Sequence, residues 1–442
     1  MKTFFVVSLG CAKNTVDADS MAQLLQREGY RPTDDAAEAD VVIVNTCGFI
    51  QAAREESLEV LQEFAEAKRP GQFLIAAGCL TQRYGEDVAK QVPGVDAILG
   101  TRRWMDIVDV VRRLGRQGHP KPLFHLPEAA TVGRDERGTA RVTVQGGSAY
   151  LKIADGCRRK CAFCAIPLIK GTLVSRPKEA ILEDARLLRD HGVQEIVLIA
   201  QDTTDYGHDR GERDGLASLL EDLVAAVPDV PWIRVMYAFP GYVTDHLIDV
   251  MASHPQIVPY LDMPLQHAHP ATLRRMQRPA NLDWVHRTLE KVRRAMPEVA
   301  LRTTFIVGYP GETEAEFQAL LDFVEAVRFD RVGAFQFSFE PGTASEPLGD
   351  PIPPEVKQAR WEALMARQQE ISLARNQQFV GRVMDVLVEG YDAEAGISIG
   401  RTYRDAPEID GLVLIEGRLP VGKIAPVRIT GAMPYDLTGV PK

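Results

Sequence analysis

The sequence lacks a long apolar run, has little cysteine and shows no excess of positive charge. No stretch approaches the roughly 18 apolar residues that a membrane-spanning helix needs, so we expect no membrane span. The apolar start FFVVSL (4–9) is shorter than a typical secretory core and follows a single lysine, which disfavours export. No tandem repeat or low-complexity segment occurs. We therefore expect a cytoplasmic globular protein.

The charge balance is acidic. Lys and Arg number 51 against 61 Asp and Glu, a formal net charge of −10 over 442 residues. This balance disfavours a protein that grips nucleic acid over a broad surface, because phosphates require Lys and Arg. It permits a basic protein partner. The length allows about two to four domains.

The six cysteines fall into two groups of three. Disulfides are disfavoured in a large cytosolic chain, so metal or redox chemistry is the better interpretation. One group is compact, within 157–164, and the other is spread between 11 and 79.

Residues 1–116 alternate strand and helix patterns. Apolar runs at 4–10, 41–49, 73–80 and 97–101 are separated by amphipathic stretches such as 19–30 and 51–68. This rhythm predicts an N-terminal α/β domain with a parallel sheet flanked by helices. Residues 117–142, rich in Pro, Gly and charge, are predicted to form a linker.

Residues 143–374 repeat a strand–helix unit six times. The predicted strands are 149–157, 195–203, 233–240, 259–266, 302–310 and 332–341. A full eight-unit barrel takes about 250 residues, so we expect a partial (βα)6 barrel. Residues 375–442 change to short strands punctuated by Gly and Asp, which predicts a small antiparallel β-barrel. The fold class is therefore α/β with a C-terminal β-barrel.

The compact cysteine group is the first candidate site. Its residues are Cys157, Cys161 and Cys164, and no fourth ligand lies nearby, since the next histidine, His191, sits in a helix–strand connection. Structural zinc normally takes four protein ligands, so a zinc site would need a distant fourth. A cubane iron–sulfur cluster with three thiolates instead leaves one iron open to a small molecule.

The spacing C-x3-C-x2-C, with Phe163 before the last cysteine, resembles the radical S-adenosylmethionine superfamily. The resemblance implies a 4Fe-4S cluster whose open iron binds S-adenosylmethionine. It also implies cleavage of this cofactor to a radical that abstracts hydrogen from an unactivated carbon. The superfamily uses a partial barrel, in agreement with the fold predicted above.

The other group, Cys11, Cys47 and Cys79, follows three predicted strands. In a parallel sheet the carboxyl ends of strands meet in one crevice, so these thiols should converge. Buried core cysteines are the alternative, because free cysteine is often buried. We favour a second cluster with three protein ligands.

The segments SLGCAKNTVDAD (8–19), NTCGFI (45–50) and AGCLTQRYG (77–85) resemble the N-terminal domain of the radical S-adenosylmethionine methylthiotransferases. This family inserts sulfur into a C–H bond and methylates it, with two 4Fe-4S clusters. The order of N-terminal domain, barrel and C-terminal TRAM-type domain matches across essentially the whole chain.

The family has branches acting on a tRNA adenosine and one acting on an aspartate of a small-subunit ribosomal protein, the twelfth of the S series. The segments SLGCAKN (8–14), AQDTTDYG (200–207) and PYLDMPLQHAHPATLRRMQRP (259–279) resemble the ribosomal-protein branch. Residues 376–442 hold seven Lys or Arg against nine Asp or Glu. An acidic barrel suits a basic protein substrate. A tRNA methylthiotransferase stays the alternative, and a non-catalytic iron–sulfur carrier or RNA-binding scaffold is a more distant one.

Analogy with the superfamily gives four further cofactor-binding candidates. They are Phe163, Gln201, Gly308 and Gly311. Core packing for Phe163 and ordinary turns for the glycines are the competing interpretations. No nucleophile–base pair suggests hydrolysis, so no catalytic side chain is assigned. Sulfur and electron donors are implied as partners, and a monomer is expected.

Overall fold

The computed structural model describes residues 2–116, 122–132 and 136–442. It divides into two compact units, each described by itself below. The first unit contains Met1–Thr143, Ala154–Arg176 and Ser338–Glu346. The second unit contains Val144–Ile153, Pro177–Phe337 and Pro347–Lys442.

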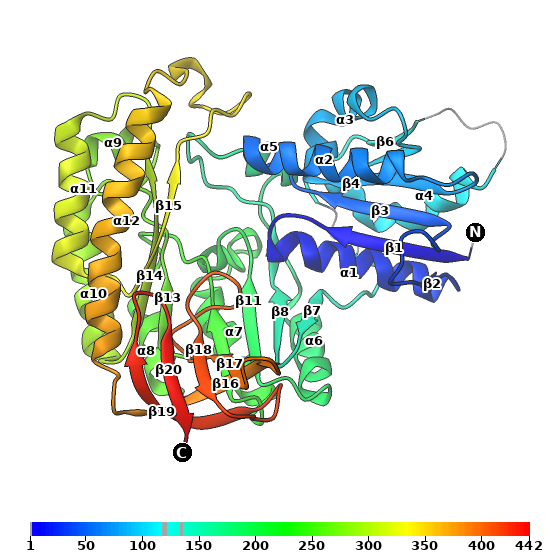
Figure 1. Ribbon diagram of the computed structural model, residues 1–442. Helices are drawn as coiled ribbons and strands as arrows, with labels where there is room; N and C mark the ends of the chain where they lie inside the picture. Colours follow the sequence, from blue (N-terminus) through cyan, green and yellow to red (C-terminus); the bar gives the residue numbers. More distant parts are fainter. Residues whose placement is uncertain (1, 117–121, 133–135) are drawn as a thin grey trace. The chain divides into compact units, whose positions relative to one another are not determined.

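The first unit is built on a six-stranded sheet in which every pairing is parallel (Figure 1). In spatial order its strands are β2 (Arg31–Pro32), β1 (Thr3–Ser8), β3 (Val41–Thr46), β4 (Phe73–Gly78), β5 (Ala97–Gly100) and β6 (Leu123–His125). The predicted parallel sheet is confirmed. Part of the segment predicted as a linker forms β6, while residues 117–121 and 133–135 of that segment lie outside the described residues.

Helices cover both faces of this sheet, which explains why β3 and β5 are buried along their whole length. On one face α1 (Ala12–Arg27) and α4 (Ile107–Leu114) enclose a core that includes Met21, Leu25 and Trp104. On the other face α2 (Gln51–Glu66) and α3 (Cys79–Gln91) enclose a core around Leu61 and Val88. The remaining elements of the unit are η1 (Thr101–Asp106), β9 (Ala154–Asp155), α5 (Ile166–Lys170) and β10 (Val174–Ser175).

The second unit holds the predicted partial barrel, with six parallel strands in two sheets. The strands are β8 (Ser148–Lys152), β11 (Glu195–Ile199), β12 (Trp232–Val235), β13 (Tyr260–Asp262), β14 (Ala300–Val307) and β15 (Arg331–Gln336). A further strand, β7 (Val142–Gln145), neighbours β8. A parallel bridge between Ile233 and Ile257 joins the two sheets.

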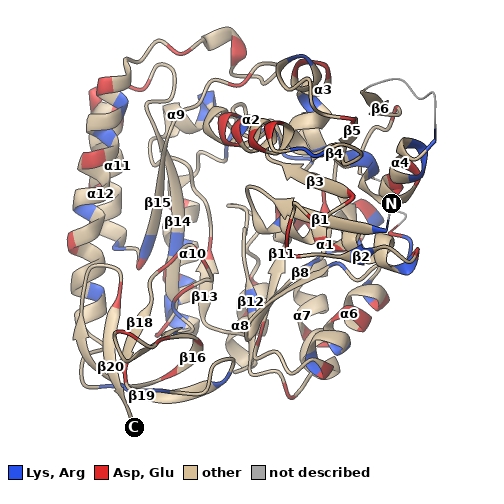
Figure 2. Ribbon diagram, turned by 45° about the vertical axis from the view of Figure 1, so that its right-hand side comes forward, with Lys and Arg blue, Asp and Glu red and all other residues tan. Residues whose placement is uncertain are grey.

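Helices flank the outer side of these strands (Figure 1). They are α6 (Lys178–Asp190), α7 (Gly215–Ala226), α8 (Asp245–Ser253), α9 (Pro270–Arg275), α10 (Leu282–Ala295), α11 (Glu314–Val327) and α12 (Pro354–Gln377). Acidic and basic residues are interspersed along α12, whereas the charged residues of α11 are all acidic (Figure 2). A capping box between Thr313 and Glu316 fixes the start of α11 directly after the end of β14.

The C-terminal strands form a closed five-stranded barrel, as predicted. The strands are β16 (Val383–Asp392), β17 (Ile397–Arg401), β18 (Val413–Glu416), β19 (Ile424–Ala432) and β20 (Leu437–Pro441). All pairings are antiparallel except β18 with β20, which is parallel. Closure leaves no free edge, which suits strands this short.

Buried ion pairs join this C-terminal barrel to the strands of the partial barrel. Glu195 accepts hydrogen bonds from Arg234 and from Arg401, each at 2.7 Å. Arg331 pairs with Asp405, and Arg404 pairs with Asp330 at 2.8 Å. Because an unpaired buried charge is costly, the segment 401–405 and the partial barrel stabilise each other.

Candidate functional site

Three cysteines converge at one edge of the N-terminal sheet. Cys11 follows β1, Cys47 follows β3 and Cys79 follows β4, and these three strands are neighbours in the sheet. The thiols are close enough that Cys11 and Cys47 both act electrostatically on Cys79. The convergence predicted for this group is therefore observed.

Two glycines make this close approach possible. Gly10 has a φ of +90°, and a Cβ there would lie 2.7 Å from the Cβ of Cys47. Gly78 has a φ of +103°, and its Cβ would lie 2.5 Å from the carbonyl oxygen of Thr46. Both positions need a residue without a side chain.

Asn14 ties the strand ends together from the first turn of α1. Its buried amide nitrogen donates to the carbonyl oxygens of Leu9, Asn45 and Thr46 at 2.8, 3.2 and 3.1 Å. Its side-chain oxygen lies 3.7 Å from the Cys79 sulfur. The role of Asn14 could not be predicted from the sequence, because a buried asparagine leaves no periodic signal.

Two of these three thiols, Cys47 and Cys79, are at least partly buried. Burial raises the pKa of the Cys79 thiol to about 12, and Lys170 opposes the rise. Burial also raises the pKa of Cys47, whereas Cys11 is exposed. Two of the thiols therefore stay protonated at neutral pH unless a cation replaces the proton, which is what metal ligation does.

The compact cysteine group lies in the loop between β9 and α5 of the same unit. The Cys157 amide donates to the Gly171 carbonyl at 3.1 Å, and the Cys164 amide donates to the Cys161 carbonyl at 3.1 Å. The Arg159 amide donates to the Cys157 sulfur at 3.4 Å. Hydrogen bonds to ligand sulfurs are one of the features that set the potential of an iron–sulfur cluster.

All six cysteines are free thiols. Across residues 2–116, 122–132 and 136–442, no group of three or more His, Cys, Asp or Glu is arranged to hold a single metal ion. In a cubane cluster each thiolate binds a different iron atom, so its ligands stand further apart than those of one ion. Three free thiols at three neighbouring strand ends supply the soft donors that such a cluster takes.

A small buried core cluster connects the two cysteine groups. Cys79, at the start of α3, packs with Ala165 and Ile169 in one small core cluster. Arg102 holds the end of α5 from the N-terminal domain, donating to the Ile169 carbonyl at 2.9 Å and to the Leu168 carbonyl at 2.7 Å. Helix α5, which follows the compact cysteines, is thereby held in contact with Cys79 of the other group.

The remaining predicted residues belong to different units. Phe163 is half-buried in the first unit, beside Cys164. Gln201 is half-buried after β11 in the second unit, and its Oε1 is buried without a hydrogen-bond partner among the described residues. An orphaned acceptor at a strand end suits a polar ligand.

The two predicted glycines follow β14, both with left-handed φ values, +71° at Gly308 and +79° at Gly311. A Cβ at Gly308 would meet Lys357 Cγ at 2.4 Å, so the close neighbour there is a side chain of this chain. The Gly308 amide donates to Glu312 at 2.6 Å, and His267 and Arg360 bind the same carboxylate at 2.9 and 2.7 Å. Sequence reasoning missed this buried network because its members come from three distant segments.

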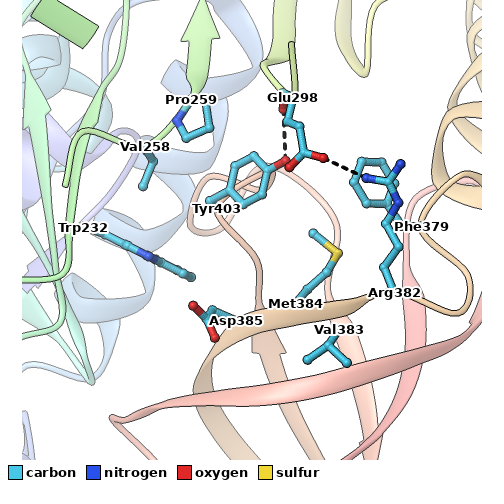
Figure 3. Close-up of a pocket in the computed structure, with 10 residues that line it drawn as sticks. All are labelled: Trp232, Val258, Pro259, Glu298, Phe379, Arg382, Val383, Met384, Asp385 and Tyr403. Carbon is cyan, nitrogen blue, oxygen red and sulfur yellow. Dashed lines mark hydrogen bonds and ion pairs between the residues drawn. The ribbon is translucent and has the colours of Figure 1, made fainter. Parts of the chain in front are cut away.

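A cavity of about 290 Å³ lies elsewhere in the second unit (Figure 3). Trp232 opens β12, Pro259 precedes β13 and Glu298 precedes β14, so the cavity lies at the amino ends of the strands. Met384 and Tyr403 of the C-terminal barrel line its other side. Gln201 and Gly308 follow the carboxyl ends of their strands, so this cavity is not the cofactor site predicted from them.

None of the described helices is both long and apolar enough to cross a membrane.

Comparison with known proteins agrees with this architecture. Three family models match in order: Uncharacterized protein family UPF0004 at residues 3–100, the Radical SAM superfamily at 151–324 and the TRAM domain at 380–441. A solved radical S-adenosylmethionine methyltransferase, TsrM from Kitasatospora setae, aligns with a TM-score of 0.56 and 12% identity, covering 87% of this chain and 77% of that one. The cobalamin-dependent S-adenosylmethionine radical enzyme OxsB aligns with a TM-score of 0.51 and 12% identity, covering 84% and 56%. These likenesses show the fold.

The fold and the matched models define a radical S-adenosylmethionine enzyme. A protein of Chloroflexus aurantiacus, the ribosomal protein uS12 methylthiotransferase RimO, is 52% identical over 99% of both chains. A protein with the same description from a Synechococcus species is 46% identical over 98% of this chain and 93% of its own. The chain belongs to the RimO family of radical S-adenosylmethionine methylthiotransferases.

Proposed function

We propose that this enzyme adds a methylthio group to the β-carbon of an aspartate in ribosomal protein uS12. The observation that carries the proposal is the full-length identity of 52% with a RimO protein, together with two separate groups of three free cysteines. The ribosomal substrate implies work in the cytoplasm, and we expect a monomer that receives sulfur and electrons from separate donors.

Each cysteine group would hold one 4Fe-4S cluster. Cys157, Cys161 and Cys164 would leave an iron open to S-adenosylmethionine, and Cys11, Cys47 and Cys79 would hold the second cluster. When bound, the clusters and S-adenosylmethionine supply the radical that removes hydrogen from an unactivated carbon, and the sulfur and methyl group that replace it. The chain itself positions the thiols and buries Cys79 of the second group against Ala165 and Ile169.

Phe163, Gln201, Gly308 and Gly311 remain our candidates for contacts with S-adenosylmethionine. Gln201 has the strongest support, because its Oε1 is buried and unpartnered in the described part of the chain. The domain boundaries that we propose are 1–116, 117–142, 143–374 and 375–442. The matched family ranges 3–100, 151–324 and 380–441 each fall inside a proposed domain.

The C-terminal barrel supports a protein substrate over tRNA. Residues 376–442 carry seven Lys or Arg and nine Asp or Glu. The buried side chains of Arg401, Arg404, Asp405 and Asp410 contribute equal numbers of each sign. The charges left for a partner are therefore acidic on balance, which complements a basic ribosomal protein.

Cysteine variants test the two roles. The Cys11→Ala enzyme should still cleave S-adenosylmethionine reductively to 5′-deoxyadenosine, because the compact group is intact, but it should transfer no sulfur. The Cys157→Ala enzyme should do neither. Both products can be measured by mass spectrometry with reduced enzyme and a uS12 peptide. Methylthio peptide from the Cys11→Ala enzyme would contradict the assignment.

A further inference from the structure

Four charged side chains are buried together in the first unit, and nothing proposed above uses them. They are Asp17, Arg141, Asp155 and Lys170, none more than 8% exposed. The Lys170 ammonium lies 2.5 Å from Asp17 Oδ2 and 3.5 Å from Asp155 Oδ1. Arg141 pairs with Asp17, lies 3.4 Å from Asp155 and stacks on the Trp104 ring at 4.2 Å.

These four charged side chains connect the segments that carry the two cysteine groups. Asp17 lies on α1, which begins directly after Cys11. Asp155 precedes Cys157 by two residues. Lys170 ends α5, next to Ile169, which packs on Cys79.

Lys170 is the member whose neighbour in the chain contacts the spread cysteine group. It directly follows Ile169, which packs on the buried Cys79, and its own side chain is 2% exposed. A buried cation at this place favours negative charge on the thiols beside it. Burial alone would lower the pKa of Lys170, but Asp17 and Asp155 outweigh burial and raise it, so the ammonium is charged at neutral pH.

We propose that Lys170 is a positioning residue that sets the reduction potential of the cluster held by Cys11, Cys47 and Cys79, with Asp17 as its counter-charge. The proposal rests on the assignment of these cysteines to a cluster. Reduction adds one negative charge to a site that is buried on the side of Cys79, and a buried cation on that side stabilises the charge far more than an exposed one does. Asp17 limits the effect, because its carboxylate lies beside the same ammonium.

The charges make opposite predictions for two substitutions. Lys170→Met removes the cation and keeps the two carboxylates of Asp17 and Asp155, so the local charge becomes more negative and the potential should fall. Asp17→Asn removes a counter-charge, so the potential should rise. Lys170→Arg keeps the charge and should keep the potential near that of the unchanged chain. Lys178→Met, which removes an exposed lysine paired with Asp222, is the matched control and should change nothing.

The measurement is a redox titration followed by electron paramagnetic resonance on the full-length chain. Cys157, Cys161 and Cys164 are replaced by Ala in every sample, so that only the other cluster gives a signal. We expect at least a tenfold change in the reduction equilibrium for Lys170→Met and for Asp17→Asn, in opposite directions. For a one-electron couple tenfold is about 59 mV.

Unchanged potentials in both variants, or shifts in the same direction, would overturn the proposal. If Lys170→Met binds no iron, Asp17→Asn decides alone: a raised potential supports the role of Lys170, and an unchanged or lowered one refutes it. If the parent chain with Cys11, Cys47 and Cys79 intact shows no cluster signal, the cluster assignment fails. That outcome differs from a cluster signal whose reduction potential is the same in all variants, which would refute only the role of Lys170.

Discussion

At the scale of single residues, Gly10 shows how little room exists at the cysteine end of the N-terminal sheet. A side chain there would need a left-handed backbone and would also collide with Cys47. Gly29 has nearly the same φ, +86°, but nothing within 4 Å of its Cβ position. A comparison of substitutions at Gly10 and Gly29 therefore distinguishes the cost of backbone strain from the cost of the contact with Cys47.

We predict that Gly10→Ala displaces Cys47 and loses the iron of the N-terminal cluster, about half of the iron per chain. Gly29→Ala should cost only the left-handed backbone, about 1–2 kcal/mol, and keep its iron. Iron content per chain after reconstitution measures both. Equal iron in the two variants would show that the contact with Cys47 does not matter.

The residue scale also marks the limit of sequence reasoning. Cys11, Cys47 and Cys79 could be predicted to converge because each follows an apolar run, and the ends of parallel strands meet. Lys170 and Asp17 could not be paired in advance. They lie 153 positions apart, and neither stands in a pattern that distinguishes a buried ion pair from two solvated charges.

At the scale of elements, long apolar runs were the reliable signal. The strands β3 and β4 lie where the apolar runs 41–49 and 73–80 predicted them, because buried parallel strands need apolar residues on both faces. The strand β14 overlaps the predicted strand 302–310, although only alternate residues of its second half are buried. The short strands β2, β6 and β10 have two or three residues and gave no pattern, and β9 is the last part of the predicted strand 149–157. The predicted strand 332–341 is shorter in the structure, since β15 ends at Gln336.

The buried pairs of β11 with the C-terminal barrel predict a pH dependence. Burial alone would raise the pKa of Glu195, but Arg234 and Arg401 lower it from 4.5 to about 2. The folded state holds the proton less tightly than the unfolded state. The stability that Glu195 contributes is therefore complete above pH 4.5 and is lost as the pH falls from 4.5 towards 2.

We predict that Glu195→Gln lowers stability by about 3–5 kcal/mol at pH 7, because two buried guanidinium groups lose their carboxylate. The difference in unfolding free energy between the variant and the unchanged protein should decrease steadily below pH 4.5. Urea unfolding midpoints at pH 7 and pH 3 test this. Glu298→Gln is the control, since its pair with Arg382 is more than half exposed and should contribute little at either pH. A gap that stays constant between the two pH values would contradict the role of Glu195.

At the scale of the whole molecule, the order of three kinds of fold could be predicted from periodicity and composition alone. The assignment of chain segments to the two compact units could not be predicted in this way. Residues 154–176 and 338–346 belong to the first unit, although both lie inside the range that periodicity assigned to the barrel. Such grouping depends on specific side-chain packing, for example Cys79 against Ile169, which periodicity does not encode.

The central claim is that the substrate is an aspartate of a ribosomal protein. The most direct test is mass spectrometry of tryptic ribosomal peptides and of digested tRNA from cells with and without this protein. We predict that a methylthio mass increment disappears from an aspartate-containing peptide of uS12 while tRNA nucleosides stay unchanged. Loss of a methylthio adenosine from tRNA, with the uS12 peptide unaffected, would contradict the account.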